Sequence, residues 1–381
     1  MNSKWEYKKI GDVCIVERGG SPRPIEQYIT DEDDGINWIK IGDTSESMYI
    51  TATAQKIRRE GMKKSRYVKP GDFLLSNSMS FGRPYILKID GCIHDGWLVL
   101  RDKNDLFDKR FLYYYLSAKP TYEKFKSMAV GGVVNNLNSE MVRNVYVPVP
   151  SKADQAKIAD LFDAANTVLL KCQQQLQKLD ELVKARFVEM FGDPMTNPKG
   201  FPCYTVGEVI DFQGGSQPDK IYFEYEPTPD NIRLIQIRDY KSDKYVTYIP
   251  KSMAKRFCTA DDIMIGRYGP PIFQILKGIE GSFNVALMKA TPKMGNREFV
   301  RQFLKQDCLL EYLEGLSKRT AGQDGIQMDK LKAYPFPYPP IELQNQFAIF
   351  VEQIDKSKAV IQKALDEAQL LFDSLMQKYF G

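Results

Sequence analysis

Two segments of the sequence combine glycine with side chains that can form paired hydrogen bonds. The first is Ser76-Asn77-Ser78-Met79-Ser80-Phe81-Gly82-Arg83, and the second is Gly266-Arg267-Tyr268-Gly269. Arginine can donate two bonds to the edge of a guanine, asparagine or glutamine can pair similarly with adenine, and glycine lets a backbone approach its partner closely. Both segments therefore predict loops that read nucleobases, although tight turns between strands are the alternative. The candidate contacts are Ser76, Asn77, Ser78, Arg83, Arg267 and Tyr268.

A second matched pair of polar loops adds amide side chains. These loops are Gly131-Gly132-Val133-Val134-Asn135-Asn136 and Thr320-Ala321-Gly322-Gln323-Asp324. They contribute Asn135, Asn136 and Gln323 to the candidates. His94, which stands beside Asp95 and near Trp97, could also reach DNA. A histidine whose hydrogen bonds are satisfied inside the fold is an equal alternative.

Clusters of lysine and arginine are the expected phosphate contacts. They are Arg58, Arg59, Lys63, Lys64 and Arg66 in the first half of the chain, and Lys255, Arg256, Lys318 and Arg319 in the second. A solvated face is an equal alternative for each cluster. The net charge of +4, from 53 basic and 49 acidic residues, permits a nucleic-acid partner without requiring one.

The sequence offers little to catalysis. Its one histidine would have to serve any Ser-His-Asp or Cys-His site, and neither GxSxG nor GxxxxGK[ST] occurs. Tyr338-Pro339-Pro340-Ile341 is similar to the Asx-Pro-Pro-aromatic loop of adenine methyltransferases but lacks its flanking residues, so a rigid connector is the better interpretation. The six cysteines lie far apart and form no CxxC pair, which favours buried reduced thiols over a zinc site.

Composition and length indicate a folded protein of two or three domains. The chain has 381 residues, of which 43% are hydrophobic and 27% charged. No apolar run approaches the ~20 residues that a membrane span needs, and the N-terminus lacks the apolar core of a signal peptide. We therefore expect a cytoplasmic protein that does not enter a membrane.

The candidate segments belong to an internal repeat. Ile10-Gly11-Asp12-Val13 and Gly19-Gly20-Ser21 return, about 196 residues later, as Val206-Gly207-Glu208-Val209 and Gly214-Gly215-Ser216. At the same offset, Ile36-Asn37-Trp38-Ile39-Lys40-Ile41-Gly42-Asp43 matches Ile232-Arg233-Leu234-Ile235-Gln236-Ile237-Arg238-Asp239. The alternating apolar residues of these two segments predict a strand buried mainly on one face.

Later blocks correspond at offsets of 187 to 190 residues. Gly71-Asp72-Phe73-Leu74-Leu75-Ser76 matches Asp261-Asp262-Ile263-Met264-Ile265-Gly266, and Phe81-Gly82-Arg83-Pro84 is aligned with Tyr268-Gly269-Pro270-Pro271. Asp108-Lys109-Arg110-Phe111-Leu112 matches Asn296-Arg297-Glu298-Phe299-Val300. Val147-Pro148-Val149-Pro150 matches Phe336-Pro337-Tyr338-Pro339, with Gln155 and Gln344 leading into a helix each time. The shared order and nearly constant offset argue against chance.

Each repeat then ends in a long helix with heptad spacing. Apolar residues recur every three or four positions from Ile158 to Met190 and from Phe347 to Tyr379. At 1.5 Å per residue, each helix would be roughly 50 Å long. Both end in Phe-Gly, where glycine suits a left-handed cap. Because pseudo-twofold symmetry can place the helices antiparallel, we expect a long coiled coil, with a local three-helix core as the alternative.

These features predict an α+β protein. Two mixed α/β recognition domains would be arranged pseudo-symmetrically around a long antiparallel two-helix coiled coil. The expected boundaries are a first recognition domain over residues 1–150, a long helix over 151–192, a second recognition domain over 193–340 and a second long helix over 341–381.

The tandem arrangement resembles the specificity subunit of type I restriction–modification enzymes over nearly the whole chain. The resemblance rests on the repeated Ile-Gly-Asp and Val-Gly-Glu blocks, the Pro-x-Pro segments, the helix starts at Gln155 and Gln344, and the paired Phe-Gly ends. None of these motifs is specific alone, but the ordered set is. In that family each repeat is a target-recognition domain followed by a conserved helix. The two domains read the halves of a split DNA site, and the helices set the spacer.

The resemblance implies a non-catalytic, sequence-specific DNA-binding subunit with no cofactor of its own. Methylation would belong to modification subunits, expected to be two, that use S-adenosylmethionine; cleavage would belong to restriction subunits that use ATP and Mg²⁺. Divergence between the shared blocks predicts an asymmetric target. Domains at the ends of a ~50 Å rod could also meet major grooves one turn, ~34 Å, apart. The alternatives are a free-standing nuclease or methyltransferase with an unrecognised site, or a coiled-coil scaffold that does not bind DNA.

Overall fold

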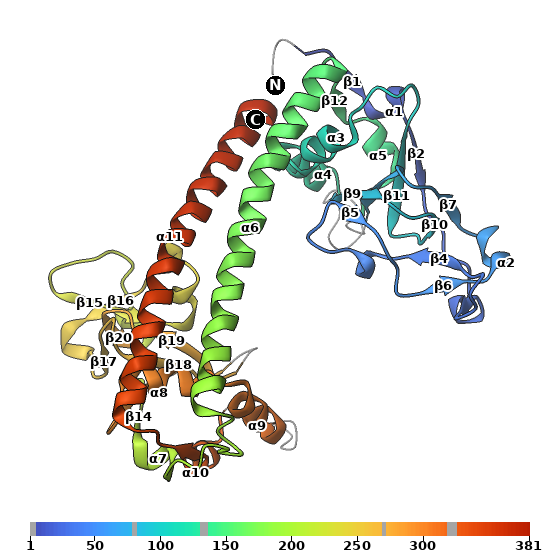
Figure 1. The fold of residues 1–381 in the computed structure, drawn as a ribbon. Coiled ribbons are helices and arrows are strands. Elements are labelled where there is room, and N and C mark those ends of the chain that lie inside the picture. Colours follow the sequence, from blue (N-terminus) through green and yellow to red (C-terminus); the bar gives the residue numbers. More distant parts are fainter. Residues whose placement is uncertain (1–4, 78–81, 130–135, 269–271, 318–325) are drawn as a thin grey trace. The chain divides into compact units, whose positions relative to one another are not determined.

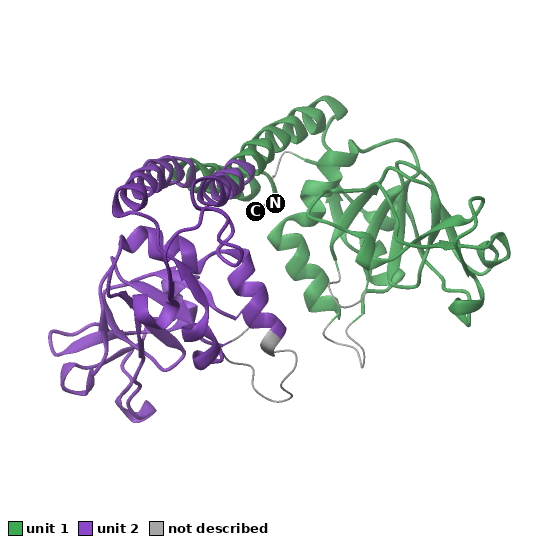
Figure 2. Ribbon diagram, turned by 60° about the horizontal axis from the view of Figure 1, so that its bottom comes forward, with its two compact units in different colours: residues 1–173, 363–381 green, residues 174–362 purple. Residues whose placement is uncertain are grey.

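The computed structural model describes residues 5–77, 82–129, 136–268, 272–317 and 326–381. The chain forms two compact units, which contain residues 1–173 with 363–381 (unit 1) and residues 174–362 (unit 2) (Figure 2). Each unit contains sheets, short helices and a part of each of two long helices, α6 and α11 (Figure 1). The mixed α/β fold expected from the sequence is confirmed.

Two five-stranded sheets form most of unit 1. The main sheet has the order β2 (Cys14–Arg18), β11 (Trp97–Asp102), β8 (Phe73–Ser76), β9 (Pro84–Leu87) and β5 (Tyr49–Ile50). The second sheet has the order β3 (Ile29–Thr30), β6 (Lys56–Ile57), β4 (Ile36–Ile39), β10 (Gly91–Ile93) and β7 (Arg66–Val68). A separate antiparallel pair joins β1 (Tyr7–Lys9) to β12 (Tyr146–Pro148), in the Pro-x-Pro segment that precedes α6.

The short helices of unit 1 lie between these strands. They are α1 (Ile10–Val13), α2 (Arg59–Met62), α3 (Lys109–Ser117), α4 (Lys119–Ala129) and α5 (Ser139–Arg143). The carboxylate of Asp108 accepts the backbone N–H groups of Arg110 and Phe111, which fixes the start of α3. Through this cap, the segment that follows β11 sets the direction of α3.

In the main sheet of unit 1, the strands β8 and β9 and most of β11 are buried on both faces. Along β11, Leu98 and Leu100 belong to the apolar cluster that includes Phe111 of α3, whereas Trp97 and Val99 belong to a second cluster. Because successive side chains of a strand point to opposite faces, a strand covered on both sides must be apolar throughout. The covered sheet provides a fixed base for the loops at its ends.

Unit 2 repeats this plan. Its main sheet has the order β14 (Ile210–Gly214), β21 (Leu287–Pro292), β18 (Ile263–Gly266) and β19 (Gln274–Lys277). Its second sheet has the order β16 (Tyr248–Pro250), β15 (Asn231–Ile235), β20 (Gly281–Phe283) and β17 (Phe257–Cys258), and β13 (Cys203–Thr205) pairs with β22 (Pro335–Pro337). The helices are α7 (Val206–Val209), α8 (Arg297–Leu304), α9 (Asp307–Ser317) and α10 (Met328–Ala333).

Strand pairing confirms the internal repeat. In unit 1, β4 runs parallel to β10, and in unit 2, β15 runs parallel to β20. The order β2-β11-β8-β9 of unit 1 returns as β14-β21-β18-β19 in unit 2. Within the described residues, the main sheet of unit 2 has no strand equivalent to β5.

The strand expected over residues 36–43 is shorter than its pattern indicates. β4 ends at Ile39 and a short 3₁₀ helix follows at Ile41–Asp43; in unit 2, β15 ends at Ile235 before a 3₁₀ helix at Ile237–Tyr240. The aspartate at the end of each segment causes the turn. Asp43 accepts the backbone N–H of Lys40 at 2.7 Å, and Asp239 accepts that of Gln236 at 3.0 Å.

The alignment of residues 81–84 with residues 268–271 is wrong. Leu75 of β8 pairs with Pro84 of β9, whereas Ile265 of β18 pairs with Ile275 of β19. Backbone hydrogen bonding therefore makes Gln274 the counterpart of Arg83, and Asn77 the counterpart of Arg267. The loop is one residue longer in unit 2, because six residues (77–82) separate Ser76 from its partner Arg83 and seven (267–273) separate Gly266 from Gln274. The alignment by sequence matched glycine and proline residues at positions that strand pairing shows not to be equivalent.

The long helices pack antiparallel within each unit, as expected. α6 (Lys152–Phe191) and α11 (Ile341–Phe380) have 40 residues each, so each is about 60 Å long. In unit 1 the ring of Phe162 stacks on Phe380 at 5.5 Å, and in unit 2 the ring of Phe187 lies 5.6 Å from Phe347. Each unit thus pairs the beginning of one helix with the end of the other.

A third helix joins the pair in each unit. In unit 1, Tyr114 of α3 stacks on Phe162 at 4.8 Å, and in unit 2, Phe299 of α8 stacks on Phe187 at 5.6 Å. The two alternatives for these helices therefore coexist, because the antiparallel pair is locally completed to a three-helix core. No helix of the described residues is long and apolar enough to cross a membrane.

Two buried glutamines attach the long helices to the sheets. Gln155 of α6 is 0% exposed; it accepts the N–H of Asp108 at 2.8 Å and donates to the carbonyls of Leu106 and Pro150, both at 2.9 Å. Gln344 of α11 repeats this, accepting from Asn296 and donating to Pro339, both at 2.8 Å. Each glutamine therefore joins the start of a long helix to the Pro-x-Pro segment and to the capping residue of α3 or α8.

Candidate nucleic-acid interface

Three loops of unit 1 meet at one end of the main sheet. They follow β2 (residues 19–23) and β8 (Asn77 and residues 82–83 among the described residues), and precede β11 (residues 94–96). Strand pairing brings them together, because Arg18 and Ser76 lie opposite Leu98 and Trp97 at the start of β11. Loops held at the rim of a buried sheet are a common location for binding residues.

Asp95 is the centre of this loop cluster. Its carboxylate accepts the hydroxyl of Ser21 at 2.8 Å and pairs with Arg23 at 3.3 Å. Its carbonyl accepts from Arg18 at 3.0 Å and from the amide of Asn77 at 2.8 Å. The hydrogen bond from Ser21, opposed by partial burial and aided by His94 and Arg23, holds the pKa of Asp95 below its usual value. Asp95 thus orders two arginines at the surface, Arg23 through its charged carboxylate and Arg18 through its backbone carbonyl.

Close backbone packing requires one glycine of each Gly-Gly-Ser motif, the first in unit 1 and the second in unit 2. A Cβ on Gly19 would lie 2.1 Å from the carbonyl oxygen of His94, and one on Gly215 would lie 1.9 Å from that of Asn284. The N–H of Gly19 donates to Trp97 at 2.9 Å, and that of Gly215 to Leu287 at 3.1 Å. The motif therefore lays one loop directly on the turn that precedes β11 or β21.

The structure gives His94 a part in this turn. Its Nδ1 lies 2.6 Å from the N–H of Gly96 and its Nε2 3.3 Å from that of Ile41; since a neutral imidazole accepts at one nitrogen, the shorter contact is the hydrogen bond. Burial lowers the pKa of His94, although the nearby carboxylate of Asp95 raises it in part. In unit 2, Asn284 takes the same place and accepts the N–H of Ala286 at 3.1 Å. This arrangement favours the alternative of a satisfied structural histidine.

Ser76 and Asn77 are buried rather than presented to a ligand. Both are 1% exposed. The backbone N–H of Ser76 donates to the carbonyl of Arg83 at 3.0 Å, and its hydroxyl accepts the N–H of Arg83 at 2.9 Å. The carbonyl of Asn77 accepts the N–H of Leu137 at 2.9 Å, which brings the segment before α5 to the same cluster. These two predicted contacts thus close the loop, and direct base contact by them is corrected to positioning.

Two predicted residues of unit 2 do reach the surface. Arg267 is half-buried, and its guanidinium lies over the ring of Tyr268 at 5.3 Å and donates to the carbonyl of Val285 at 3.4 Å. Tyr268 and Val285 are each 47% exposed. Stacking on the tyrosine and the bond to the carbonyl limit the positions that the guanidinium can take.

The basic segment of unit 1 is exposed around α2. Lys64 donates to the hydroxyl of Tyr28 at 2.7 Å, Arg59 lies 3.5 Å from Asp34, and Arg66 lies 3.3 Å from Glu17. Arg58 and Lys63 have no ion-pair partner among the described residues. These exposed pairs contribute little to stability, so their cations remain available to phosphates.

The remaining candidates are spread over both units. Lys255 and Arg256 are exposed just before β17, and Asn136 is half-buried beside Leu137. Five predicted contacts lie outside the described residues: Ser78, Asn135, Lys318, Arg319 and Gln323.

Several surface residues escaped the sequence analysis. Arg18 and Arg23 flank the Gly-Gly-Ser motif and contact Asp95. Their position on both sides of a repeated motif is a signal that the sequence contains. In unit 2, Tyr225 and Tyr245 are 69% and 60% exposed, and Lys244 lies over the ring of Tyr245 at 5.1 Å. Tyrosines interleaved with lysines in loops between short strands are the signal that was overlooked.

Removing Arg58 and Lys63 together by alanine substitution is expected to weaken DNA binding equally on all sequences. The slope of log affinity against log salt should fall by about 1 for each phosphate that is no longer neutralised. Titration of specific and random duplexes over a salt series would measure this slope, with Lys157→Ala on α6 as a control of equal charge change per residue. A selective loss on the specific duplex would instead mean that these residues touch bases.

Thiols and metal ligands lie apart from this surface. Burial raises the pKa of Cys14 to about 12 and that of Cys92 to about 11, so both are protonated. Cys203 differs from the buried thiols expected, because it lies exposed on β13. Within the described residues, no three His, Cys, Asp or Glu side chains are placed to hold a metal ion.

Comparison with known proteins gives a consistent result. A profile of the family described as "Type I restriction modification DNA specificity domain" matches residues 2–181 and 198–369. The specificity subunit of the type I restriction enzyme MjaVIII of Methanocaldococcus jannaschii is 22% identical over 94% of this chain and 90% of its own length. The MjaIX specificity subunit of the same organism is 24% identical over 63% of this chain and 64% of its own length.

The fold has solved counterparts. A crystal structure of a type I restriction–modification S subunit from M. genitalium covers 100% of this chain and 97% of its own, with a TM-score of 0.57 at 17% identity. At this identity the likeness concerns the fold alone.

Proposed function

We infer, because the chain belongs to the family of type I restriction–modification DNA specificity subunits, that each of its units reads one half of a split DNA site. Membership of this family makes the chain a DNA-recognition subunit that is not itself catalytic. The half-site assignment adds to this the expectation that the two units act on different sequences.

One observation carries the proposal: a common loop framework holds different side chains in the two units. Gly19 and Gly215 make the same close contact with the turn that precedes β11 or β21. On this framework, the buried Asn77 stands where the second unit has Arg267, which reaches the surface, and Asp95, which pairs with Arg23, stands where it has Val285. Since the two units thus present different side chains at matching positions of the surface, the target would be asymmetric.

The long helices would set the distance between the two half-sites. Each is a continuous element of 40 residues, and both units contain a part of each. An uninterrupted helix transmits position better than a flexible linker. The helices would therefore fix the spacer, which the repeat of their lengths supports.

The partner subunits would dock on the exposed apolar side chains of the helices. In unit 1 these are Val168, Leu170, Leu370 and Leu371, which are 45–71% exposed. In unit 2 they are Leu182, Val188, Ile349 and Val360, which are 46–71% exposed. One such set in each unit suits two modification subunits, with restriction subunits joining the assembly. S-adenosylmethionine and ATP with Mg²⁺ would be bound by these partners, and the complex would act on DNA in the cytoplasm.

Replacing Arg267 with alanine tests the half-site assignment. The variant is expected to lose about 1–3 kcal/mol of discrimination at one base of one half-site, because a bidentate guanidinium contact is removed. Sequencing of methylated DNA from cells that carry the complete system would record the change as relaxed recognition in that half. Lys255→Ala is the matched control, since a phosphate contact in the same unit weakens binding without changing the motif. An unchanged motif, or equal loss at both halves, would contradict the assignment.

A further inference from the structure

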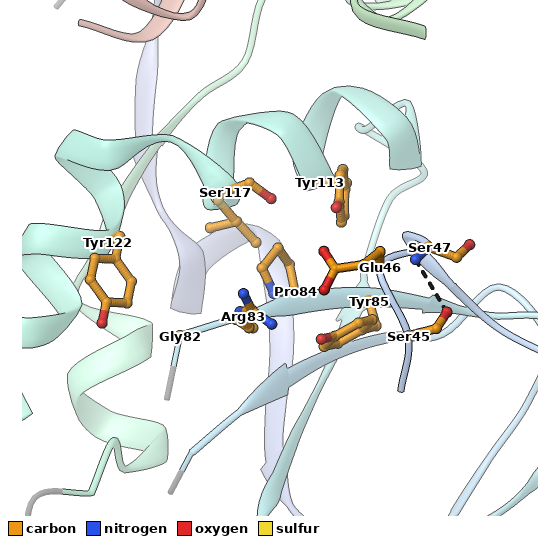
Figure 3. A pocket seen from close by; sticks show the side chains of 11 residues that line it. Ser45, Glu46, Ser47, Gly82, Arg83, Pro84, Tyr85, Tyr113, Ser117 and Tyr122 are labelled. Carbon is orange, nitrogen blue, oxygen red and sulfur yellow. Dashed lines mark hydrogen bonds between the residues drawn. The ribbon is translucent and has the colours of Figure 1, made fainter. Parts of the chain in front are cut away.

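A pocket of about 400 Å³ opens beside Arg83 in unit 1 (Figure 3). Its walls come from the start of β9, from α3 and α4, and from residues 45–47 before β5. Three tyrosines line it: Tyr85, Tyr113 and Tyr122. Small-ligand sites typically measure about 300–1,000 Å³ and combine aromatic walls with a few placed polar groups. The pocket therefore has the size and the lining of a site for one flat, small ligand.

Arg83 is held at the rim by its backbone. Its N–H donates to the hydroxyl of Ser76 at 2.9 Å, and its carbonyl accepts the N–H of Ser76 at 3.0 Å. Gly82, with φ +78°, makes the turn that precedes it. The backbone of Arg83 is thus fixed, whereas its guanidinium has no hydrogen-bond or ion-pair partner among the described residues.

Glu46 brings the opposite charge to the same space. It is exposed, and within the described part of the chain its carboxylate forms no ion pair. Figure 3 shows it on the segment whose Ser45 hydroxyl accepts the N–H of Ser47 at 3.2 Å. The pocket thus offers one acceptor group and one donor group that the protein leaves unused.

The phenol of Tyr113 is affected by both charged groups. Burial raises the pKa of its phenol, while Arg83 and the hydrogen bond with Ser117 lower it and Glu46 raises it. Arg83, Glu46 and Tyr113 all line this one pocket (Figure 3). A ligand that fills the space before Tyr113 would consequently meet Arg83 and Glu46 together.

The same position in unit 2 has a different lining. Strand register makes Gln274 the counterpart of Arg83, and the helix caps Asp108 and Asn296 make Arg301 the counterpart of Tyr113. There a pocket of about 580 Å³ is lined by Arg301, Lys305 and Gln274. The site is retained between the two units while its chemistry changes, as expected if it selects a ligand.

We propose that the unit 1 pocket binds a guanine base, with Glu46 accepting from its N1–H and amino group and Arg83 donating to its O6 and N7. Guanine presents two adjacent donors on one edge and two acceptors on the next, which matches a carboxylate and a guanidinium. Adenine would turn the lone pair of its N1 towards the carboxylate and has no O6. The tyrosine rings supply faces on which the base can stack.

The guanine can come from a free nucleotide or from a base displaced from the DNA helix. Displacing a base costs a few kcal/mol, and the cost is lowest where the base is already unpaired. Only the second source rests on the DNA-reading function proposed above. The first would make the pocket a site for a small ligand on the same unit.

Binding of guanosine monophosphate and adenosine monophosphate to the full chain by calorimetry tests the first source. Duplexes that carry one unpaired guanine or one unpaired adenine, otherwise identical, test the second by competition. We expect guanine to be preferred over adenine in at least one of the two formats. Glu46→Gln and Arg83→Gln should each weaken the guanine complex about tenfold, because glutamine can make only one of the two hydrogen bonds that the charged group makes.

Glu26→Gln, an exposed carboxylate elsewhere in unit 1, is the matched control and should leave guanine binding unchanged. Thermal unfolding of each variant would establish that it is folded. Equal affinity for guanine and adenine, or no binding of either in both formats, overturns the proposal, as does a guanine preference that survives Glu46→Gln. Binding of a fully paired specific duplex by the same preparation tests the recognition function separately, so its retention would confine the failure to the pocket.

Discussion

Replacing Gln155 with alanine is expected to lower the free energy of unfolding of unit 1 by about 3–5 kcal/mol. The side chain is 0% exposed, and its loss leaves the N–H of Asp108 and the carbonyls of Leu106 and Pro150 without the partners described. Each buried polar group left unsatisfied costs about 1–3 kcal/mol. The substitution also releases Asp108, which caps α3, from the start of α6. Urea unfolding and hydrogen exchange of the α3 amides would measure the effect.

An exposed glutamine on the same helix provides the control. Gln175→Ala changes the same chemical group on the surface of α6, where alanine is a good helix former, and should alter stability by less than about 0.5 kcal/mol. Gln344→Ala should increase hydrogen exchange in α8 rather than in α3. If Gln155→Ala were as stable as Gln175→Ala, the buried glutamine would not be what attaches α6 to the sheets.

Replacing Gly19 with alanine should weaken recognition by unit 1 while leaving that of unit 2 unchanged. The new Cβ would lie 2.1 Å from the carbonyl oxygen of His94, a backbone atom that cannot move without displacing the turn before β11. Arg18, Arg23 and Asn77 all hydrogen-bond or pair with Asp95 in that turn, so their arrangement would be disrupted together. Discrimination at the unit 1 half-site should fall about 10- to 100-fold, the equivalent of one bidentate contact or more.

A second glycine separates this effect from a general one. Nothing lies within 4 Å of a Cβ placed on Gly42, so Gly42→Ala should retain full recognition. Gly215→Ala, with a Cβ 1.9 Å from the carbonyl oxygen of Asn284, should affect only the other half-site. Binding to duplexes mutated in one half-site at a time would measure both. Normal recognition by Gly19→Ala would show that the close contact does not hold the reading loops.

The features that sequence predicted well are those that repeat and those set by periodicity. The tandem order of blocks identified the repeat, and heptad spacing identified α6 and α11 to within a few residues of their ends. Both depend on local pattern and on hydrophobic burial, which the order of residue types records directly.

The candidate site was less predictable, because its geometry depends on hydrogen bonds between distant segments. Ser76 and Asn77 have the side chains of a base-reading loop, yet partners at Arg83, Asp95 and Leu137 bury both. The register of the hairpin was missed for the same reason. Strand pairing, and not the similarity of glycine and proline positions, decides that Gln274 corresponds to Arg83.

The Gly-Gly-Ser motif combines a feature that sequence reveals with one that it hides. Its recurrence is a visible sign of the repeat, while its physical reason lies in contacts that no local pattern records. The approach of Gly19 to the carbonyl of His94 explains why this position tolerates no side chain, and it places the neighbouring arginines around Asp95.

The distribution of the long helices between the units has a consequence for biosynthesis. Unit 1 combines residues 1–173 with residues 363–381, and Phe380 packs against Phe111 and Phe162 in its core. While the ribosome is still translating unit 2, the first domain lacks this segment and exposes the apolar surface that it will cover. Contacts across such a large sequence separation form slowly, and partly folded chains of this kind are prone to aggregate. Unit 1 therefore completes its folding only after unit 2 has been synthesised. The connectivity of the chain thus makes both units ready to bind DNA at about the same time.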